Sequence, residues 1–208
     1  ARLATGELCY KLNADGDNWF QCIDEDTYPM PFNTHSKVFF VGDAGYATMY
    51  DTTSGYELNG DAKAYVATLN NTWLDLTEVE GVPVATPVVL KGTYYNKVAA
   101  NLPAISVPND LKGTDTDIEA DGTMYVLAKF DGKAGFYKAE GTIAAGKAYY
   151  QSTSGVKAFY FGNGDATSIQ TIDNAQKTTE DAIYNIAGQR LNKVQKGINI
   201  INGKKVLY

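Results

Sequence analysis

The sequence predicts an all-β protein, with antiparallel β-sandwich structure followed by a C-terminal β tail. Three observations predict it. Apolar residues alternate with a period of two along most of the 208-residue chain, as they do in half-buried strands. The 15 Tyr, 8 Phe and 20 Gly favour strands joined by tight turns. Asn-Gly and Asp-Gly pairs, which tolerate the positive φ angles of two-residue hairpins, separate the apolar runs.

Strands are expected where the apolar runs are clearest, and hairpins at the turn pairs between them. The predicted strands are residues 38–41, 65–69, 124–130, 148–150, 158–161 and 198–201. The predicted turns are Asn59-Gly60, Asp121-Gly122, Asp131-Gly132 and Asn202-Gly203.

Three regions follow from this reading. Residues 1–36 are predicted to be an extended N-terminal segment, residues 37–164 a β-sandwich region, and residues 165–208 a linker with a C-terminal β tail. Residues 165–181 are mostly small and polar, as linkers are. A tail of about forty residues rarely buries enough apolar area to fold alone. We therefore expect it to pack on the preceding region or to complete one of its sheets.

An internal similarity links two parts of the β-sandwich region. Residues 80–85 resemble residues 140–145, about sixty positions later, and each leads into a β-rich run. Two interpretations are open. The chain contains two related β units, or Gly-rich turns resemble each other by chance.

The charge excludes some classes of partner. With 18 Lys and Arg against 24 Asp and Glu, the formal net charge is −6. Nucleic acids and anionic membranes attract basic surfaces, so neither is an expected partner. No segment reaches the roughly 18 apolar residues of a membrane-spanning helix, and no membrane span is predicted.

The types and spacing of the reactive side chains do not indicate a catalytic site. His35 is the single histidine, no Gly-x-Ser-x-Gly sequence is present, and a loop position is expected for it. One His and two separated Cys do not supply a usual zinc ligand set. Paired carboxylates for glycoside hydrolysis depend on their separation in space, and the acids here cluster in turns. The sequence predicts a protein that is not an enzyme and has no cofactor.

The two cysteines leave two alternatives open. Cys9 and Cys22 could close a small disulfide loop in an oxidising compartment, or they could be two free thiols.

A structural calcium site is one candidate. Asp117, Glu119 and Asp121, followed by Gly122, copy the first half of a calcium loop, with oxygen ligands at alternating positions before a sharp turn. Ala128 stands where a bidentate Glu would close a complete loop. The alternative interpretation is a set of solvated carboxylates in turns.

Carbohydrate binding is the sharpest functional hypothesis, because sugar rings stack on aromatic faces beside hydrogen-bonding groups. Trp73 follows Asn70-Asn71-Thr72 in a predicted loop and is the leading candidate. The others are Tyr94, Tyr95 and Trp19. In the alternative interpretation these aromatics fill the core or pair across strands.

The C-terminus carries a resemblance to a known family. Residues 184–191, 197–200 and 202–206 resemble the C-terminal sorting domain of exported Bacteroidota proteins. The resemblance implies type IX secretion, the secretion machinery as a partner, and a secreted or cell-surface location. The tail is then either a working sorting signal or a structural cap.

Residues 6–13, 19–21, 26–29, 135–137 and 147–150 resemble segments of large secreted Bacteroidota proteins, which range from polysaccharide-degrading enzymes to adhesins. We therefore expect a non-catalytic accessory module of a secreted or cell-surface bacterial protein. One alternative is a carbohydrate-binding module appended to a polysaccharide-degrading enzyme, with a polysaccharide as partner. The other is a structural spacer or adhesin stalk.

Overall fold

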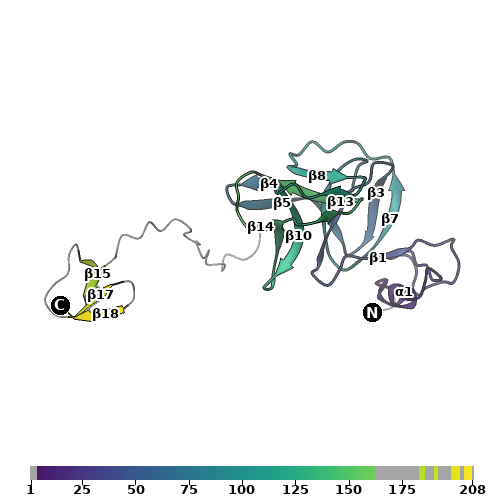
Figure 1. Ribbon diagram of the computed structural model, residues 1–208. Coiled ribbons are helices and arrows are strands. Elements are labelled where there is room, and N and C mark those ends of the chain that lie inside the picture. Colours follow the sequence, from purple (N-terminus) through teal and green to yellow (C-terminus); the bar gives the residue numbers. More distant parts are fainter. Residues whose placement is uncertain (1–3, 163–182, 186–189, 192–197, 202–203, 208) are drawn as a thin grey trace. The chain divides into compact units, whose positions relative to one another are not determined.

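The computed structural model describes residues 4–162 and, in the tail, residues 183–185, 190–191, 198–201 and 204–207. The chain divides into two compact units, Ala1–Asp165 and Ala166–Tyr208. Nearly all regular structure is β, and most of it is antiparallel, which confirms the predicted fold class (Figure 1). The first unit contains both the predicted N-terminal segment, residues 1–36, and the predicted β-sandwich region, residues 37–164.

The N-terminal segment contains a helix where extended chain was predicted. Helix α1 (Glu7–Leu12) has an acid in its first turn and a base in its last, and the Glu7 and Lys11 side chains pair at 2.6 Å. This i, i+4 spacing and charge order stabilise a helix. Cys9 is the buried residue of α1 and packs against Ile23 and Val38, so tertiary packing holds the short helix in place.

A small three-stranded sheet follows. It consists of β1 (Val38–Phe40), β7 (Tyr94–Ala100) and β3 (Gly55–Gly60), in the order β1-β7-β3, and all its pairs are antiparallel. Figure 1 shows β3 and β7 side by side at one side of the body.

The main sheet has nine strands. In spatial order they are β2 (Tyr46–Met49), β6 (Val88–Lys91), β4 (Lys63–Asn70), β5 (Trp73–Val79), β14 (Ala158–Phe161), β11 (Lys133–Lys138), β10 (Met124–Phe130), β13 (Lys147–Gln151) and β8 (Leu111–Thr114). Only β14 and β5 pair in parallel. The sheet is nearly closed: beyond β2, the Tyr50 N–H donates to the carbonyl of Gly146, just before β13, at 2.9 Å.

Period-two alternation divides the apolar residues between two cores. On β4, Ala64 and Val66 pack in a core shared with the small sheet, while Ala67 packs in the inner core of the curved main sheet. Tyr125 and Phe136 are fully buried in that inner core. Each such side chain contributes about 1.5–3 kcal/mol by leaving water, so these two cores are the main source of stability.

The main sheet is built from two similar halves. A shift of sixty residues carries the pair Asn70 and Trp73 of the β4–β5 hairpin onto the pair Phe130 and Lys133 of the β10–β11 hairpin. The strand order β2-β6-β4-β5 is also mirrored, on the other side of β14, by β8-β13-β10-β11. The short pair β9 (Ile118–Glu119) and β12 (Thr142–Ile143) lies beside the second half. This repetition favours two related β units as the origin of the sequence similarity.

The turn predictions succeeded in part. Asp131-Gly132 joins the β10–β11 hairpin, with positive φ at both residues. Asn59-Gly60 and Asp121-Gly122 do not close hairpins, because at both places the chain passes from one sheet to another. The loop of the β4–β5 hairpin is Asn71-Thr72 instead, with φ of 57° at Asn71. Asn202-Gly203 lies outside the described residues.

The described strands of the tail form a sheet of their own. They are β15 (Ile183–Asn185), β16 (Arg190–Leu191), β17 (Ile198–Ile201) and β18 (Lys204–Leu207), antiparallel in the order β16-β15-β17-β18. Each of these strands pairs with another described strand of the tail. The predicted linker, residues 165–181, lies outside the described residues. Within the described parts of the chain, no helix has the length and apolarity to cross a membrane.

Candidate functional site

Four aromatic side chains form a continuous row across the outer face of the main sheet. Trp73, Tyr160, Tyr137 and Phe130 come from the neighbouring strands β5, β14, β11 and β10. Successive ring centroids along this aromatic row are 6.3, 5.9 and 6.3 Å apart. These separations fall within the range for interacting aromatic pairs.

Strand alternation explains why the row faces outward. Leu74, Phe159 and Phe136, which precede or follow row residues in sequence, pack in the inner core. Successive side chains of a strand point to opposite faces of the sheet. The row residues therefore lie on the outer face, and the ring of Phe130 is the most exposed of the four, at 73%.

The rings of the row are inclined to one another. The interplanar angles are 52° between Trp73 and Tyr160, 86° between Tyr160 and Tyr137, and 61° between Tyr137 and Phe130. The row therefore offers a sequence of separate faces and edges, and not one flat surface.

Polar side chains stand at the Trp73 end of the row. The Asn70 side-chain amide donates to the Asp75 carboxylate at 2.8 Å, and the Asn71 amide donates to the Asn70 side-chain oxygen at 3.3 Å. Near the middle, the ammonium of Lys133 lies 5.9 Å from the centre of the Tyr160 ring. In such an arrangement, amide, carboxylate and ammonium groups can bind the hydroxyls of a sugar while the aromatic rings stack on its apolar faces.

Tyr137 contributes a hydroxyl group to the row. It donates to the backbone carbonyl of Lys133 at 2.9 Å. Burial, together with the neighbouring Tyr160, raises the pKa of Tyr137, so at neutral pH the phenol is an uncharged hydrogen-bonding group.

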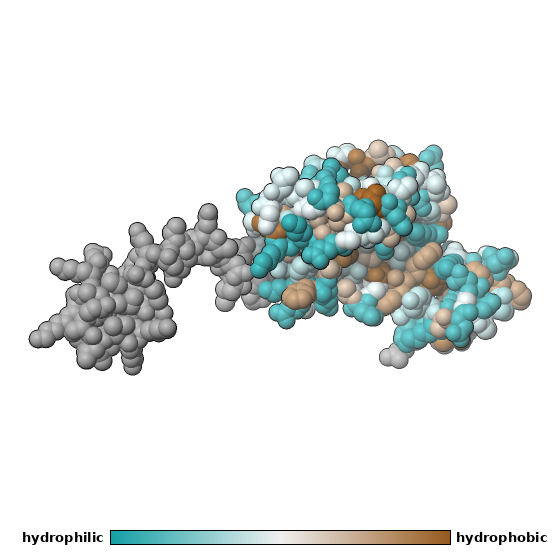
Figure 2. Space-filling view, viewed as in Figure 1, coloured by the Kyte–Doolittle hydropathy of each residue, from teal (hydrophilic) through white to brown (hydrophobic). Residues whose placement is uncertain are grey.

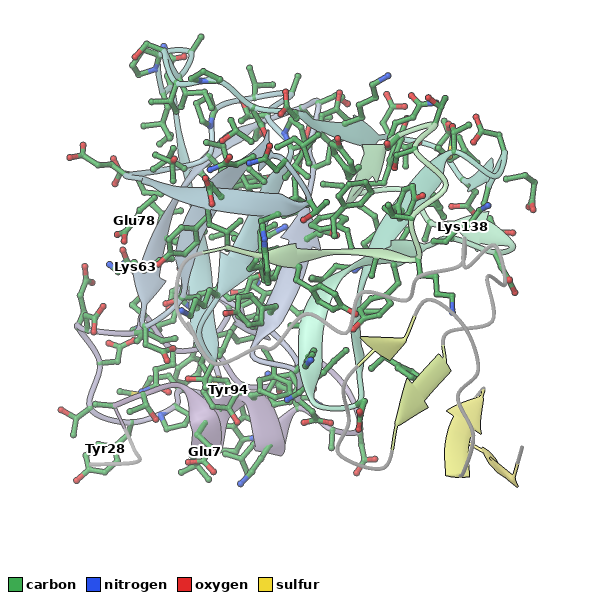
Figure 3. All side chains as sticks on the ribbon, turned by 90° about the vertical axis from the view of Figure 1, so that its left-hand side faces the viewer. Glu7, Tyr28, Lys63, Glu78, Tyr94 and Lys138 are labelled. Carbon is green, nitrogen blue, oxygen red and sulfur yellow. The ribbon has the colours of Figure 1, made fainter. Side chains whose placement is uncertain are left out.

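The other predicted carbohydrate-binding aromatics lie elsewhere. Tyr95 is 7% exposed and packs in the core under the small sheet, where burial raises its pKa to about 12, so its ring face is not open to a ligand in this structure. Tyr94 faces the opposite way and groups with Tyr10 and Phe40, near α1 (Figure 3). Trp19 is half-buried against the cluster that contains Cys9. The structure does not bring these residues together with Trp73.

The predicted calcium ligands each bind a local partner. Asp117 accepts a hydrogen bond from the backbone N–H of Ala145 at 2.9 Å, and Glu119 accepts one from the hydroxyl of Thr142 at 2.5 Å. Asp121 accepts hydrogen bonds from the backbone N–H and the hydroxyl of Thr123, and these bonds lower the pKa of Asp121. In the described part of the chain, the three acids do not form a group close enough to share one ion.

Both cysteines are free thiols, which is the second of the two alternatives. Cys9 is fully buried, and burial raises its pKa to about 11. The Cys22 sulfur lies 3.9 Å from Nδ1 of His35, and that nitrogen lies 2.7 Å from the carboxylate of Asp26. A count of Cys and His residues alone does not reveal this cluster, because its third member is a carboxylate. An acid four residues after Cys22 was the available signal.

A pocket of about 370 Å³ lies where the main sheet almost closes, between residues such as Tyr46, Ala47, Leu127 and Ala148. On the face shown in Figure 2, hydrophobic residues form small patches between hydrophilic ones. Figure 3 shows Lys63 and Glu78 together at one edge of the body and Lys138 at the opposite edge.

Comparison of the chain with protein-family models, with curated proteins and with solved structures found no match.

Proposed function

We propose that this chain is a non-catalytic accessory module of a secreted or cell-surface bacterial protein, and that it binds a polysaccharide through the aromatic row. The observation that carries the proposal is the position of Trp73, Tyr160, Tyr137 and Phe130 on one outer face, with amide and carboxylate groups at one end.

The inclination of the rings indicates the kind of polysaccharide. A flat crystalline surface needs coplanar rings, whereas these rings differ by 52° to 86°. A single glycan chain twists along its length and can present successive sugar faces at different angles. The row therefore fits an individual soluble chain better than a crystalline fibre.

The C-terminal tail is proposed to serve as a sorting or anchoring element. Its resemblance to Bacteroidota sorting domains supports this role, and so does the pairing of its described strands in a sheet of their own. A direct test is to fuse residues 166–208 to an exported reporter in a Bacteroidota host with type IX secretion. The proposal requires the reporter to reach the cell surface or medium only when the tail is present.

Binding is tested by affinity gel electrophoresis of the full chain against a panel of soluble polysaccharides. With a polysaccharide that slows the migration of the parent chain, Trp73→Ala and Tyr160→Ala should each weaken binding roughly tenfold, which corresponds to about 1.4 kcal/mol. Phe32→Ala is the matched control, because Phe32 is 63% exposed and lies outside the row. It should bind as the parent does.

Two results would contradict binding through the row. Retention that survives both substitutions would place the binding surface elsewhere. A chain that no polysaccharide retains would favour the structural spacer or adhesin stalk. Thermal melting of each variant checks that lost retention does not come from unfolding.

A further inference from the structure

Cys22, Asp26 and His35 bring three different kinds of metal-ligating atom to one place. A sulfur, a carboxylate oxygen and an imidazole nitrogen from these residues lie within 4.8 Å of one another. The His35 and Asp26 side chains are 29% and 16% exposed. An ion can therefore reach the cluster from solvent.

The backbone around the cluster is held by hydrogen bonds. The N–H groups of Glu25 and Asp26 both donate to the carbonyl of Cys22, at 3.1 and 2.8 Å, which closes a tight turn between two of the ligands. The Gln21 N–H donates to the Ser36 carbonyl at 2.9 Å and so holds the segment of His35 beside the segment of Cys22. The ligands are thus positioned before any ion binds.

The turn is also fixed to the β body. The N–H of Ile23, next to Cys22, donates at 2.7 Å to the side-chain oxygen of Asn96, which is fully buried in β7. The Cys22 N–H donates to Asp26 Oδ2 at 2.6 Å and orients the carboxylate towards the sulfur and the imidazole. Such outer hydrogen bonds are what orient ligands in metal sites.

From this geometry we propose that Cys22, Asp26 and His35 form a zinc site with three protein ligands and a fourth position open to water. Zinc bonds of about 2.3 Å to sulfur and about 2.0–2.1 Å to nitrogen or oxygen place tetrahedral ligands roughly 3.3–3.6 Å apart. The observed 3.9 Å between Cys22 Sγ and His35 Nδ1 and 2.7 Å between His35 Nδ1 and Asp26 Oδ2 bracket these separations. On binding, the sulfur–nitrogen separation would shorten by about 0.3 Å and the nitrogen–oxygen separation would lengthen by about 0.6 Å.

Zinc fits the donor set better than calcium or magnesium do. Those two ions bind oxygen almost exclusively, whereas thiolate and imidazole are ligands for zinc and similar borderline-soft ions. On binding, the Cys22 thiol gives up its proton to solvent, and the proton of the neutral imidazole lies on Nε2 so that Nδ1 can coordinate. Asp26 exchanges its hydrogen bond with His35 for a bond to the ion.

The test is a titration of the full chain, prepared without a polyhistidine tag, with zinc chloride in isothermal calorimetry. One ion should bind per chain. Cys22→Ser and His35→Gln should each weaken binding by at least about tenfold, as the loss of supporting groups does at known zinc sites. Cys9→Ser is the matched control, since Cys9 is the other thiol and lies in a separate apolar cluster. It should leave the affinity unchanged.

Cobalt(II) provides a second readout that does not depend on calorimetric heat. The Co²⁺-loaded chain should show a sulfur-to-metal charge-transfer band that Cys22→Ser abolishes and Cys9→Ser retains. Absence of zinc binding, zinc binding unaffected by Cys22→Ser and His35→Gln, or a charge-transfer band that survives Cys22→Ser would each overturn the proposal. Because the cluster lies outside the aromatic row, its failure would leave polysaccharide binding untouched.

Discussion

The side-chain amide of Asn96 holds the backbone of Ile23 to the β body. Asn96 Oδ1 accepts the Ile23 N–H at 2.7 Å, and Nδ2 donates to the carbonyls of Gln21 and Lys37, both at 2.9 Å. A single side chain in β7 thus connects Lys37, just before β1, with the N-terminal segment, although it is more than seventy residues from Ile23 in sequence.

Asn96→Ala should lower the free energy of unfolding by about 2–4 kcal/mol, because it leaves buried backbone groups without their partners. Urea-induced unfolding measures the loss. Asn33→Ala, at an exposed position of the N-terminal segment, is the control and should change stability by less than about 0.5 kcal/mol. Equal effects of the two substitutions would show that Asn96 does not carry this connection.

Asp51 predicts a dependence of stability on acid pH. Hydrogen bonds from the side chain of Thr53, the hydroxyl of Tyr56 and the backbone of Thr53 lower the pKa of Asp51. Because the folded pKa lies below the unfolded value of about 3.9, the stabilisation is present above that pH and is lost as the pH falls below it.

Asp51→Asn should therefore reduce the loss of stability between pH 5 and pH 2.5, measured by denaturant unfolding at each pH. Asp51 is only partly buried, so a difference of about 0.5–1 kcal/mol is expected after solvent screening. Asp15→Asn, at an exposed position, serves as control and should follow the parent curve. An Asp51→Asn curve parallel to the parent curve would contradict the prediction.

Gly113 allows the ends of the main sheet to approach. A β-carbon at this position of β8 would collide with the ring of Tyr50, which follows β2. Gly113→Ala should lower stability by about 1–3 kcal/mol through overpacking. The double variant Gly113→Ala with Tyr50→Ala should lose less than the sum of the two single losses, measured by thermal melting. Additive losses would mean that the two residues do not meet.

Ala85 has an unfavourable backbone conformation that glycine should relieve. Its φ is 55°, a left-handed value that costs an L-residue roughly 1–2 kcal/mol. In the second half of the main sheet, the turn before β13 has Gly146 with φ of 78°. Ala85→Gly should raise the melting temperature by a few degrees, after the greater unfolded-state entropy of glycine is subtracted. Ala145→Gly, without a positive φ, should not raise it.

Much of the fold could be predicted because it depends on local patterns. Residues 124–130, 158–161 and 198–201 were predicted as strands with the bounds that the structure shows. Side chains that alternate in polarity identify a strand wherever it lies. The helix Glu7–Leu12 was missed because its stability comes from the burial of Cys9 against distant residues, which no local pattern reveals.

The functional surfaces depended on tertiary structure. Alternation places Tyr94 and Tyr95 on opposite faces of β7, but only the packing of the small sheet on the main one shows that Tyr95 is the buried one. Trp73 was predicted as the leading binding residue. Its neighbour Tyr160 could not be, because the parallel pairing of β5 with β14 joins segments that are far apart in sequence.

One physical distinction separates the features of this chain that the sequence predicts from those that only the tertiary structure decides. The two-residue alternation of strand side chains and the residue preferences of turns depend on residues that are neighbours in sequence. The linear order of amino acids is therefore enough to specify strands and many turns. Which strands become neighbours, and which aromatic, thiol or imidazole groups then meet, follows from long-range burial of apolar surface. That is a property of the folded chain as a whole.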